Sequence, residues 1–329
     1  MNRNNEYHEQ HDEVDNAMFT QIEFTNFKGF EKLQLDGLKR VNLVVGKNNS
    51  GKTSLLEGIA LLANPRQASE LPSLLRTTYG DQNLRYFKWL IRDGSAEGLV
   101  RKVDQSGTFE LRMFSKMPNP YSPIAYFQIG SIHFITHGTD PNLKFKAVSV
   151  RNIQTDQLIK AFGSAMRQKN GEEQLERLLR AVDSRIKKIR VDPAPDGNML
   201  VVDIGLSEMV PLHQVGQGVN RLVSILSELI GENAQLCIID EIENGIHHSA
   251  LEDVWTGVAE AAAQIGVQVF ATTHSYECIE AAHAAFSKRP NYDFSIIQLF
   301  RVQNGVQGRV LDQKHIEAAI AGEIDLRGV

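Results

Sequence analysis

Residues 41–53 read VNLVVGKNNSGKT and combine a strand pattern with a glycine-rich loop. Its first five residues are mostly β-branched or leucine, which suits a strand that is buried on both faces. Gly46 follows, and four residues separate it from Gly51, Lys52 and Thr53, which is the spacing of a Walker A loop. Glycine is needed because the backbone has to curl until its N–H groups point inward at phosphate oxygens. The stretch therefore predicts a phosphate-binding loop after a buried strand.

A helix is predicted directly after the loop, because residues 54–64, SLLEGIALLAN, repeat leucine and isoleucine at helical spacing. Its N-terminus would direct the positive end of the helix dipole at the phosphates. Lys52 would reach the β- and γ-phosphates, and the Thr53 hydroxyl would bind Mg²⁺. ATP and Mg²⁺ are the expected cofactors. The loop residues expected to contact the nucleotide are Gly46, Asn48, Asn49, Ser50, Gly51, Lys52, Thr53 and Ser54.

The second half of the chain contains residues suited to ATP hydrolysis. The hydrophobic run AQLCIIDE ends in Asp240 and Glu241, a Walker B pattern. Asp240 would hold Mg²⁺, and Glu241 would orient and deprotonate the attacking water. A third buried strand, in GVQVFATTHS, leads to His274, whose side chain could donate a hydrogen bond to the γ-phosphate. Lys52, Glu241 and His274 are therefore the predicted catalytic residues of an ATPase.

A second candidate anion site lies between the two Walker motifs. Gly216 and Gly218 stand just before a helix with an apolar face, in HQVGQGVNRLVSILSELI. Glycines at a helix start leave room for an anion near the free N–H groups. Two such helix starts cannot easily contact one γ-phosphate within a single chain. The sequence therefore predicts a homodimer around ATP, or a higher oligomer built on it, in which Gly216 and Gly218 of one copy cap the nucleotide of the other.

The rest of the sequence predicts how the chain is divided. Residues 1–18 are polar and are expected to form a disordered tail. Residues 19–65 and 191–329 are expected to be the two halves of the ATPase domain, and the first begins with alternating strands. Residues 66–190 are expected to be an inserted arm or helical subdomain. Within it, a hairpin is predicted at residues 105–107, QSG.

Residues 172–190 have the period of an amphipathic helix with a basic face. Two interpretations of that face stay open at this point. It can be an ordinary solvated surface, or it can contact the phosphate backbone of DNA or RNA. The basic residues concerned are Arg177, Arg180, Arg185, Lys187, Lys188 and Arg190.

Composition narrows the class of protein. The net charge is -5, which argues against a surface coated by nucleic acid but leaves room for a local basic patch. Cys237 and Cys278 lie in apolar segments and are expected to be buried thiols, which fits a reducing cytoplasm. No stretch approaches 18 apolar residues, so no membrane span and no membrane partner are expected.

Taken together, these motifs resemble the ABC-type ATPases outside the transporter branch, the group that holds SMC and RecF proteins. More narrowly, the chain resembles the ATPase half of the OLD (overcoming lysogenisation defect) family and related antiphage-defence ATPases. The resemblance implies an α/β P-loop fold with a central, mostly parallel sheet, an antiparallel β part at the N-terminus and an inserted arm or helical subdomain. It also puts Asn244 and His247 at the dimer seam.

Two departures from these families shape the functional hypotheses. The transporter signature Leu-Ser-Gly-Gly-Gln is replaced by residues 214–218, QVGQG, which lack its serine. The Asp-x-Asp motif of the Toprim nuclease found in OLD proteins does not occur. The first hypothesis is therefore an ATP-driven switch that controls a separately encoded nuclease or toxin, in antiphage defence. The alternatives are a RecF- or SMC-like DNA-binding ATPase in repair or replication, and a slow ATP-bound scaffold of a larger complex.

Overall fold

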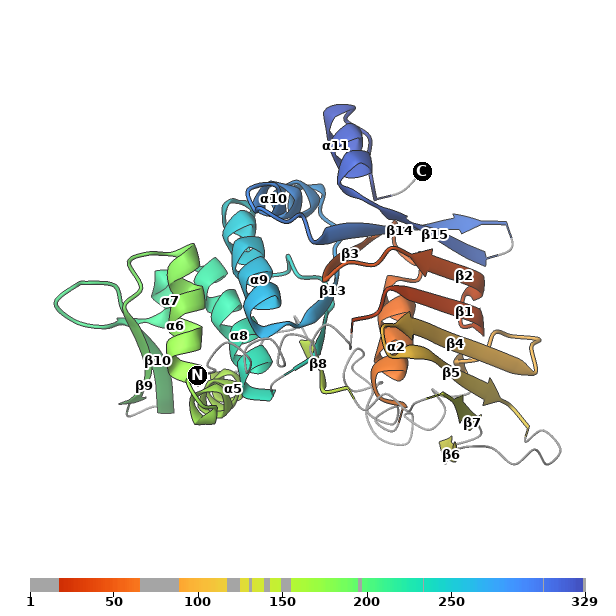
Figure 1. Cartoon of the computed structure of the whole chain (residues 1–329). Helices are drawn as coiled ribbons and strands as arrows, with labels where there is room; N and C mark the ends of the chain where they lie inside the picture. Colours follow the sequence, from red (N-terminus) through yellow and green to blue (C-terminus); the bar gives the residue numbers. More distant parts are fainter. Residues whose placement is uncertain are drawn as a thin grey trace, which may run out of the picture.

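The computed structural model describes residues 18–65, 89–116, 125–129, 132–138, 143–148, 155–194, 197–232, 234–303 and 305–327. The predicted N-terminal tail lies outside these residues, apart from Met18. Two six-stranded sheets and a smaller three-stranded sheet form the framework (Figure 1). The α/β fold class predicted from the motifs is confirmed.

The central sheet is mostly parallel and contains the strand before the Walker A loop. Its order is β15-β14-β3-β13-β12-β8, and only β15 runs antiparallel to its neighbour. The strands are β3 (Val41–Val45), β8 (Phe145–Val148), β12 (Leu236–Ile239), β13 (Gln268–Thr272), β14 (Phe294–Val302) and β15 (Gly305–Leu311). All residues of β3, β12 and β13 are buried, because both faces of the sheet are covered.

A second, antiparallel sheet lies beside the central sheet, in the order β2-β1-β4-β5-β7-β6. Its strands are β1 (Gln21–Phe27), β2 (Phe30–Asp36), β4 (Glu97–Asp104), β5 (Gly107–Phe114), β6 (Ala125–Ile129) and β7 (Ile132–His137). Helix α2 (Lys52–Ala63) contacts both sheets. A Cβ atom on Gly58 would lie 2.2 Å from the Phe24 ring, so only glycine lets the helix approach this sheet so closely.

The other face of the central sheet is covered by helices. Val41, Leu43 and Val45 of β3 pack on this side, whereas Val44 packs toward α2, so the sheet separates two hydrophobic cores. The helices are α5 (Thr155–Arg167), α6 (Gly171–Val182), α8 (Gln217–Glu232), α9 (Leu251–Ile265), α10 (Tyr276–Ser287) and α11 (Gln313–Ala321). Trp255 of α9 is fully buried and lies at the centre of this core.

The smaller sheet extends this helical side (Figure 1). It contains β9 (Lys188–Ala194), β10 (Gly197–Asp203) and β11 (Val210–Pro211) in the order β11-β10-β9. The short helix α7 (Leu212–Val215) connects it to α8, and a single helical turn, η3 (His248–Ala250), precedes α9.

The helix predicted over residues 172–190 is wrong beyond Val182. Helix α6 ends there, Asp183 adopts an extended conformation, and the chain enters β9 at Lys188. Ile186 and Ile189 are buried, but as parts of a turn and a strand. The reason is long-range: β9 pairs with β10 from Lys188 opposite Asp203 onward, and this pairing overrides the helical period.

The described strands between residues 66 and 148 do not form an inserted arm. Strand β4 pairs with β1, and β8 pairs with β12 at the edge of the central sheet. The middle of the chain therefore completes both main sheets, and its described helices are α5 and α6. The domain boundaries at residues 66 and 190 stay a prediction.

Two smaller predictions, the hairpin and the buried cysteines, are confirmed. The turn between β4 and β5 falls at Gln105-Ser106, as the hairpin prediction requires. Cys237 and Cys278 are buried free thiols. Of the helices that the structure describes, none is long and apolar enough to cross a membrane.

Candidate nucleotide-binding and hydrolysis site

The Walker A loop has a backbone that its two glycines make possible. Gly46 has a φ of 156°, and a Cβ atom there would lie 2.4 Å from the Ser50 hydroxyl and 2.6 Å from the Leu299 carbonyl. Gly51 has a φ of 95° and caps the N-terminus of α2. The Ser50 hydroxyl is buried and has no hydrogen-bond partner among the described residues. A tightly curled loop with a spare buried polar atom fits a bound phosphate group.

Lys52 is the first residue of α2 and is turned back onto the loop. Its ammonium group donates hydrogen bonds to the carbonyls of Gly46 at 2.7 Å and Lys47 at 3.0 Å. Burial lowers the pKa of Lys52 to about 8, although Asp240, Glu241 and Glu243 partly oppose this shift. The Walker A lysine and the carboxylates after β12 therefore share one site. Thr53 follows Lys52 in the first turn of α2 and is partly buried.

The pKa of Lys52 predicts a pH dependence of nucleotide binding. Phosphate favours the charged ammonium, so each pH unit above 8 removes about nine tenths of the competent form. We expect ATP affinity to weaken by about 30-fold between pH 7 and 9.5, with proton uptake on binding above pH 8. Calorimetric titrations in two buffers of different ionisation enthalpy measure both the ATP affinity and the number of protons taken up. A constant affinity over this range contradicts the assignment, and Lys52→Arg, which stays charged, should flatten the profile.

Asp240 and Glu241 are held by one hydroxyl. Thr272 of β13 donates its hydroxyl hydrogen to Asp240 at 2.6 Å and accepts the backbone N–H of Glu241 at 2.7 Å. Burial raises the pKa of Asp240, and the Thr272 hydrogen bond acts in the opposite direction. Glu241 has a φ of 52°, a strained conformation for a residue other than glycine. The Glu241 side chain is 48% exposed, so water can reach its carboxylate.

His274 follows β13 and lies beside Glu241. Its Nε2 atom is 3.7 Å from the Glu241 carboxylate. Its backbone N–H donates to the Glu243 carboxylate at 2.7 Å. Glu243 was not among the predicted site residues, although its place two residues after Glu241 could have indicated it. The structure thus brings Lys52, Asp240, Glu241 and His274 to the edge where the carboxyl ends of β3, β12 and β13 meet.

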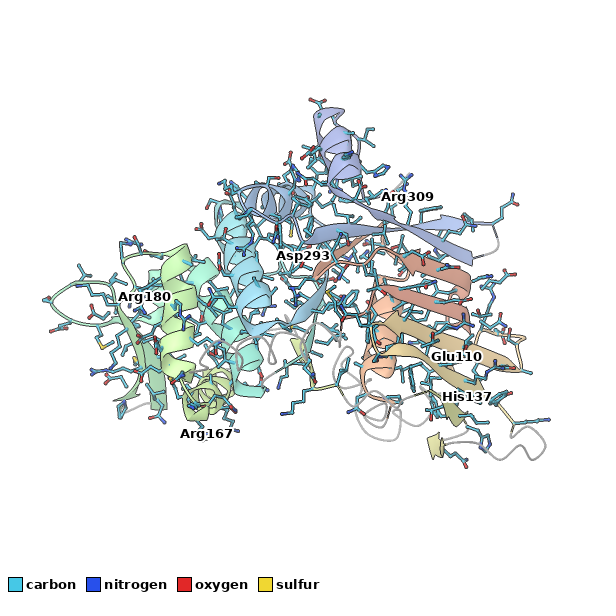
Figure 2. The ribbon with its side chains drawn as sticks, in the orientation of Figure 1. Glu110, His137, Arg167, Arg180, Asp293 and Arg309 are labelled. Atoms are coloured by element: carbon cyan, nitrogen blue, oxygen red, sulfur yellow. The ribbon has the colours of Figure 1, made fainter. Side chains whose placement is uncertain are left out.

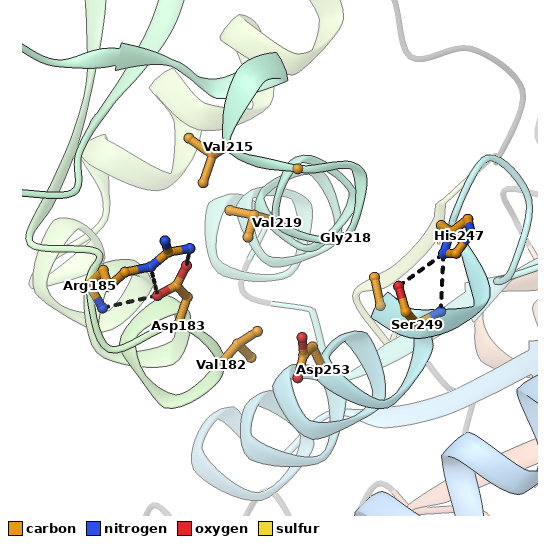
Figure 3. A pocket seen from close by; sticks show the side chains of 11 residues that line it. Val182, Asp183, Arg185, Val215, Gly218, Val219, His247, Ser249 and Asp253 are labelled. Carbon is orange, nitrogen blue, oxygen red and sulfur yellow. Dashed lines mark hydrogen bonds and ion pairs between the residues drawn. The ribbon is translucent and has the colours of Figure 1, made fainter.

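Gly216 and Gly218 lie elsewhere, in a cavity of about 600 Å³ (Figure 3). Gly216 joins α7 to α8 with a φ of 140°. A Cβ atom on Gly218 would lie 2.8 Å from that of Ala250, so glycine lets α8 approach the start of α9. The lining residues are Val182, Asp183, Arg185, Val215, Gly216, Gly218, Val219, His247, Ser249, Ala250 and Asp253. This set contains no Walker A or Walker B residue, so the two predicted anion sites are separate within one chain.

The segment after the Walker B strand reaches the same cavity. His247 lines it and shares a hydrogen bond with the Ser249 hydroxyl at 2.9 Å (Figure 3). The rings of His247 and His248 are 4.1 Å apart. Asn244, the other residue expected at a dimer seam, is exposed but does not line the cavity. Within the described part of the chain, no group of three or more His, Cys, Asp and Glu residues could hold a metal ion.

Two family models match the chain. The model described as "AAA ATPase domain" matches residues 18–112, and the model described as "AAA domain, putative AbiEii toxin, Type IV TA system" matches residues 131–280. The first therefore covers the Walker A loop, and the second covers the Walker B strand and His274.

Three similar proteins support this match. An "ATP/GTP phosphatase" of Helicobacter pylori is 23% identical, over 80% of this chain and 87% of its own length. A "DNA replication and repair protein RecF" of Lactococcus lactis is 33% identical over 96 residues, so the chain spans about a quarter, 24%, of that relative. A solved structure of an SMC head bound to the C-winged helix domain of ScpA is 11% identical, with a TM-score of 0.56 over 92% of this chain and 99% of that one. The chain therefore has the α/β fold of a P-loop ATPase of AAA/ABC type, with sequence similarity to RecF proteins and the architecture of an SMC head.

Proposed function

We propose that two copies of this chain close around Mg²⁺-bound ATP and hydrolyse it. The observation that carries the proposal is the separation of the two candidate anion sites. Lys52, Asp240, Glu241 and His274 gather at one edge of the central sheet, whereas Gly216 and Gly218 line a cavity elsewhere. A two-fold arrangement in which each cavity faces the loop of the other copy uses both sites for one nucleotide.

Each residue at the edge of the sheet has a distinct task in this proposal. The Lys52 ammonium leaves the carbonyls of Gly46 and Lys47 and binds the β- and γ-phosphates. Thr53 and Asp240 would hold Mg²⁺, which neutralises phosphate charge; a single carboxylate, a hydroxyl and phosphate oxygens suit this ion. Glu241 takes a proton from the attacking water, and His274, 3.7 Å away, contacts the γ-phosphate.

The cavity would supply a second group of contacts to the nucleotide, from the partner copy. Helix α8 has 16 residues, so its N-terminus carries a full helix dipole, and a Cβ atom on Gly216 would meet nothing within 4 Å, so the space beside this residue is open. The QVGQG segment lacks the serine of the transporter signature. Ser249 and His247 lie on the rim of the same cavity and can offer polar contacts to the partner's nucleotide in its place.

Downstream, we propose that the closed dimer controls a separately encoded effector, a nuclease or a toxin in antiphage defence. The match of residues 131–280 to the family model whose description includes a type IV toxin–antitoxin system supports this. A RecF- or SMC-like role in handling DNA is the second candidate, because 96 residues, 29% of the chain, are 33% identical to a RecF protein.

The basic face favours the first candidate over the second. Arg180 lies 3.5 Å from Glu176, Lys188 lies 3.4 Å from Glu172, and Arg190 lies 3.8 Å from Asp192. Arg180 also donates to the Lys187 carbonyl and lies on α6 (Figure 2). Acidic residues beside these basic ones reduce the local positive potential that would attract a phosphate backbone.

The dimer can be tested with a change of charge on the cavity rim. Ser249→Asp adds a carboxylate where the partner's γ-phosphate would lie, so repulsion should prevent closure, whereas Ser249→Asn has nearly the same shape and no charge. With a non-hydrolysable ATP analogue, we expect light scattering to show a dimer for the wild type and Ser249→Asn, and a monomer for Ser249→Asp.

Two results would contradict the proposal, one from light scattering and one from DNA binding. If Ser249→Asp dimerises like the wild type, the cavity is not the seam. If duplex DNA binds the analogue-loaded wild type tightly, and more weakly as salt is raised, the RecF- or SMC-like candidate replaces the effector switch.

A further inference from the structure

The chain segment after α11 returns to the hydrolysis site. Leu326 is buried, and its carbonyl accepts a hydrogen bond of 2.9 Å from the Gln298 side chain on β14. Gln298 is itself buried, accepts a hydrogen bond of 2.8 Å from Arg309 on β15 (Figure 2), and pairs with Val45, the last residue before the Walker A loop. This anchor fixes residues 325–327 beside the end of β3.

Two charged residues flank the buried Leu326. The Arg327 guanidinium donates to both carboxylate oxygens of Asp325, at 2.9 and 3.0 Å, and this pairing holds the pKa of Asp325 below its usual range. The backbone N–H of Arg327 also donates to Asp325, at 2.9 Å. Asp325 in turn experiences the positive charge of Lys47 in the Walker A loop. Hydrogen bonds between Arg327 and Asp325 therefore stabilise the segment, and Asp325 interacts electrostatically with the Walker A loop.

Arg327 also reaches the residues around His274. One of its terminal nitrogens lies 3.5 Å from the His274 carbonyl oxygen, a long hydrogen bond. The guanidinium carbon is 5.8 Å from the centre of the Tyr276 ring, within the range of a cation–π interaction. The backbone of His274 therefore has a partner on each side: its N–H donates to Glu243, and its C=O accepts from Arg327.

We propose that Arg327 is a positioning residue that sets where the His274 imidazole points toward the nucleotide. The inference rests on the proposed role of His274 in hydrolysis. His274 is 38% exposed, and its Nε2 atom lies 3.7 Å from Glu241, too far for a hydrogen bond that would fix the ring. A displacement of about 1 Å in a reacting group lowers a rate by up to about 10²-fold. Because residues 325–327 also border the Walker A loop, their position connects that loop with the histidine.

The test combines single and double variants. Arg327→Ala should lower kcat for ATP by about tenfold and leave the Kd for ATP near that of the wild type, since no binding group is removed. Arg327→Lys should recover part of the loss. Arg112→Ala is the matched control, because Arg112 is 42% exposed and paired with Glu97 on the antiparallel sheet, while Arg327 is 40% exposed. The control should keep the wild-type rate.

The double variant distinguishes a positioning role of Arg327 from a general loss of protein stability. If Arg327 acts through His274, Arg327→Ala should not slow His274→Ala any further. Multiplying effects, or a wild-type rate for Arg327→Ala, would overturn the inference. If Lys52→Ala and His274→Ala do not reduce hydrolysis, the proposed function fails instead.

A readout without turnover decides the inference in either case. The ring resonances of His274 in histidine-labelled protein should shift in Arg327→Ala and stay in place in Arg112→Ala. Unchanged resonances in Arg327→Ala contradict the positioning role.

Discussion

Replacing Glu241 with glutamine is expected to slow ATP hydrolysis by roughly 10²- to 10⁴-fold. Glutamine keeps the size of the side chain and the strained backbone at a φ of 52°, but it cannot accept a proton from water. ATP binding should survive, because Lys52, Thr53 and Asp240 are unchanged. Phosphate release at steady state measures the rate, and calorimetry measures the binding.

The Glu241→Gln variant should also accumulate the closed dimer with ATP itself, since the step that opens it is blocked. Glu317→Gln on α11 is a suitable control, because its carboxylate is exposed and accepts a hydrogen bond from Gln313 within its own helix. A turnover within a few-fold of the wild type would remove Glu241 from the role of general base.

Replacing Lys52 with alanine is expected to weaken ATP binding by at least about 10²-fold, and with it to abolish hydrolysis. The ammonium contributes a charge to two phosphate groups, and the charged groups that act most strongly on it, Asp240, Glu241 and Glu243, are all acidic. The loop carbonyls of Gly46 and Lys47 also lose their hydrogen-bond donor.

Lys52→Ala should still fold, because burial already disfavours the charged lysine and alanine suits the start of a helix. Circular dichroism and thermal melting check this point. Affinity close to that of the wild type, in a folded variant, means that residues 46–53 do not bind the phosphates.

The sequence predicted the elements whose geometry is local. The Walker A loop needs a curled backbone, and Gly46 and Gly51 are placed for it whatever the rest of the chain does. The strands that lead to the Walker A loop, to Asp240 and to His274 consist mostly of apolar residues, so their burial was predictable from composition. Parallel strands bring their carboxyl ends together, which is why residues far apart in sequence could be assigned to one site.

The wrong secondary-structure predictions concern segments whose partner strands are distant in the sequence. The apolar period of residues 172–190 is compatible with a helix, and only β10 makes residues 188–194 a strand. Similarly, β4 became part of the N-terminal sheet because β1 was an available edge. Neither fact is visible in a local pattern, because strand pairing depends on which edges are free in the folded chain.

Local sequence specifies the curled backbone of the Walker A loop, the polar residues that follow each buried strand and a second helix start with two glycines. Where these groups meet depends on the folded chain. It placed Gly216 and Gly218 with Ser249 and His247 around a separate cavity, paired the basic residues with acidic neighbours, and brought Arg327 to the carbonyl of His274. Backbone conformation and the periodic pattern of buried residues depend on neighbours a few residues away. Contacts between side chains distant in sequence form only when the sheets pack and the two hydrophobic cores are complete.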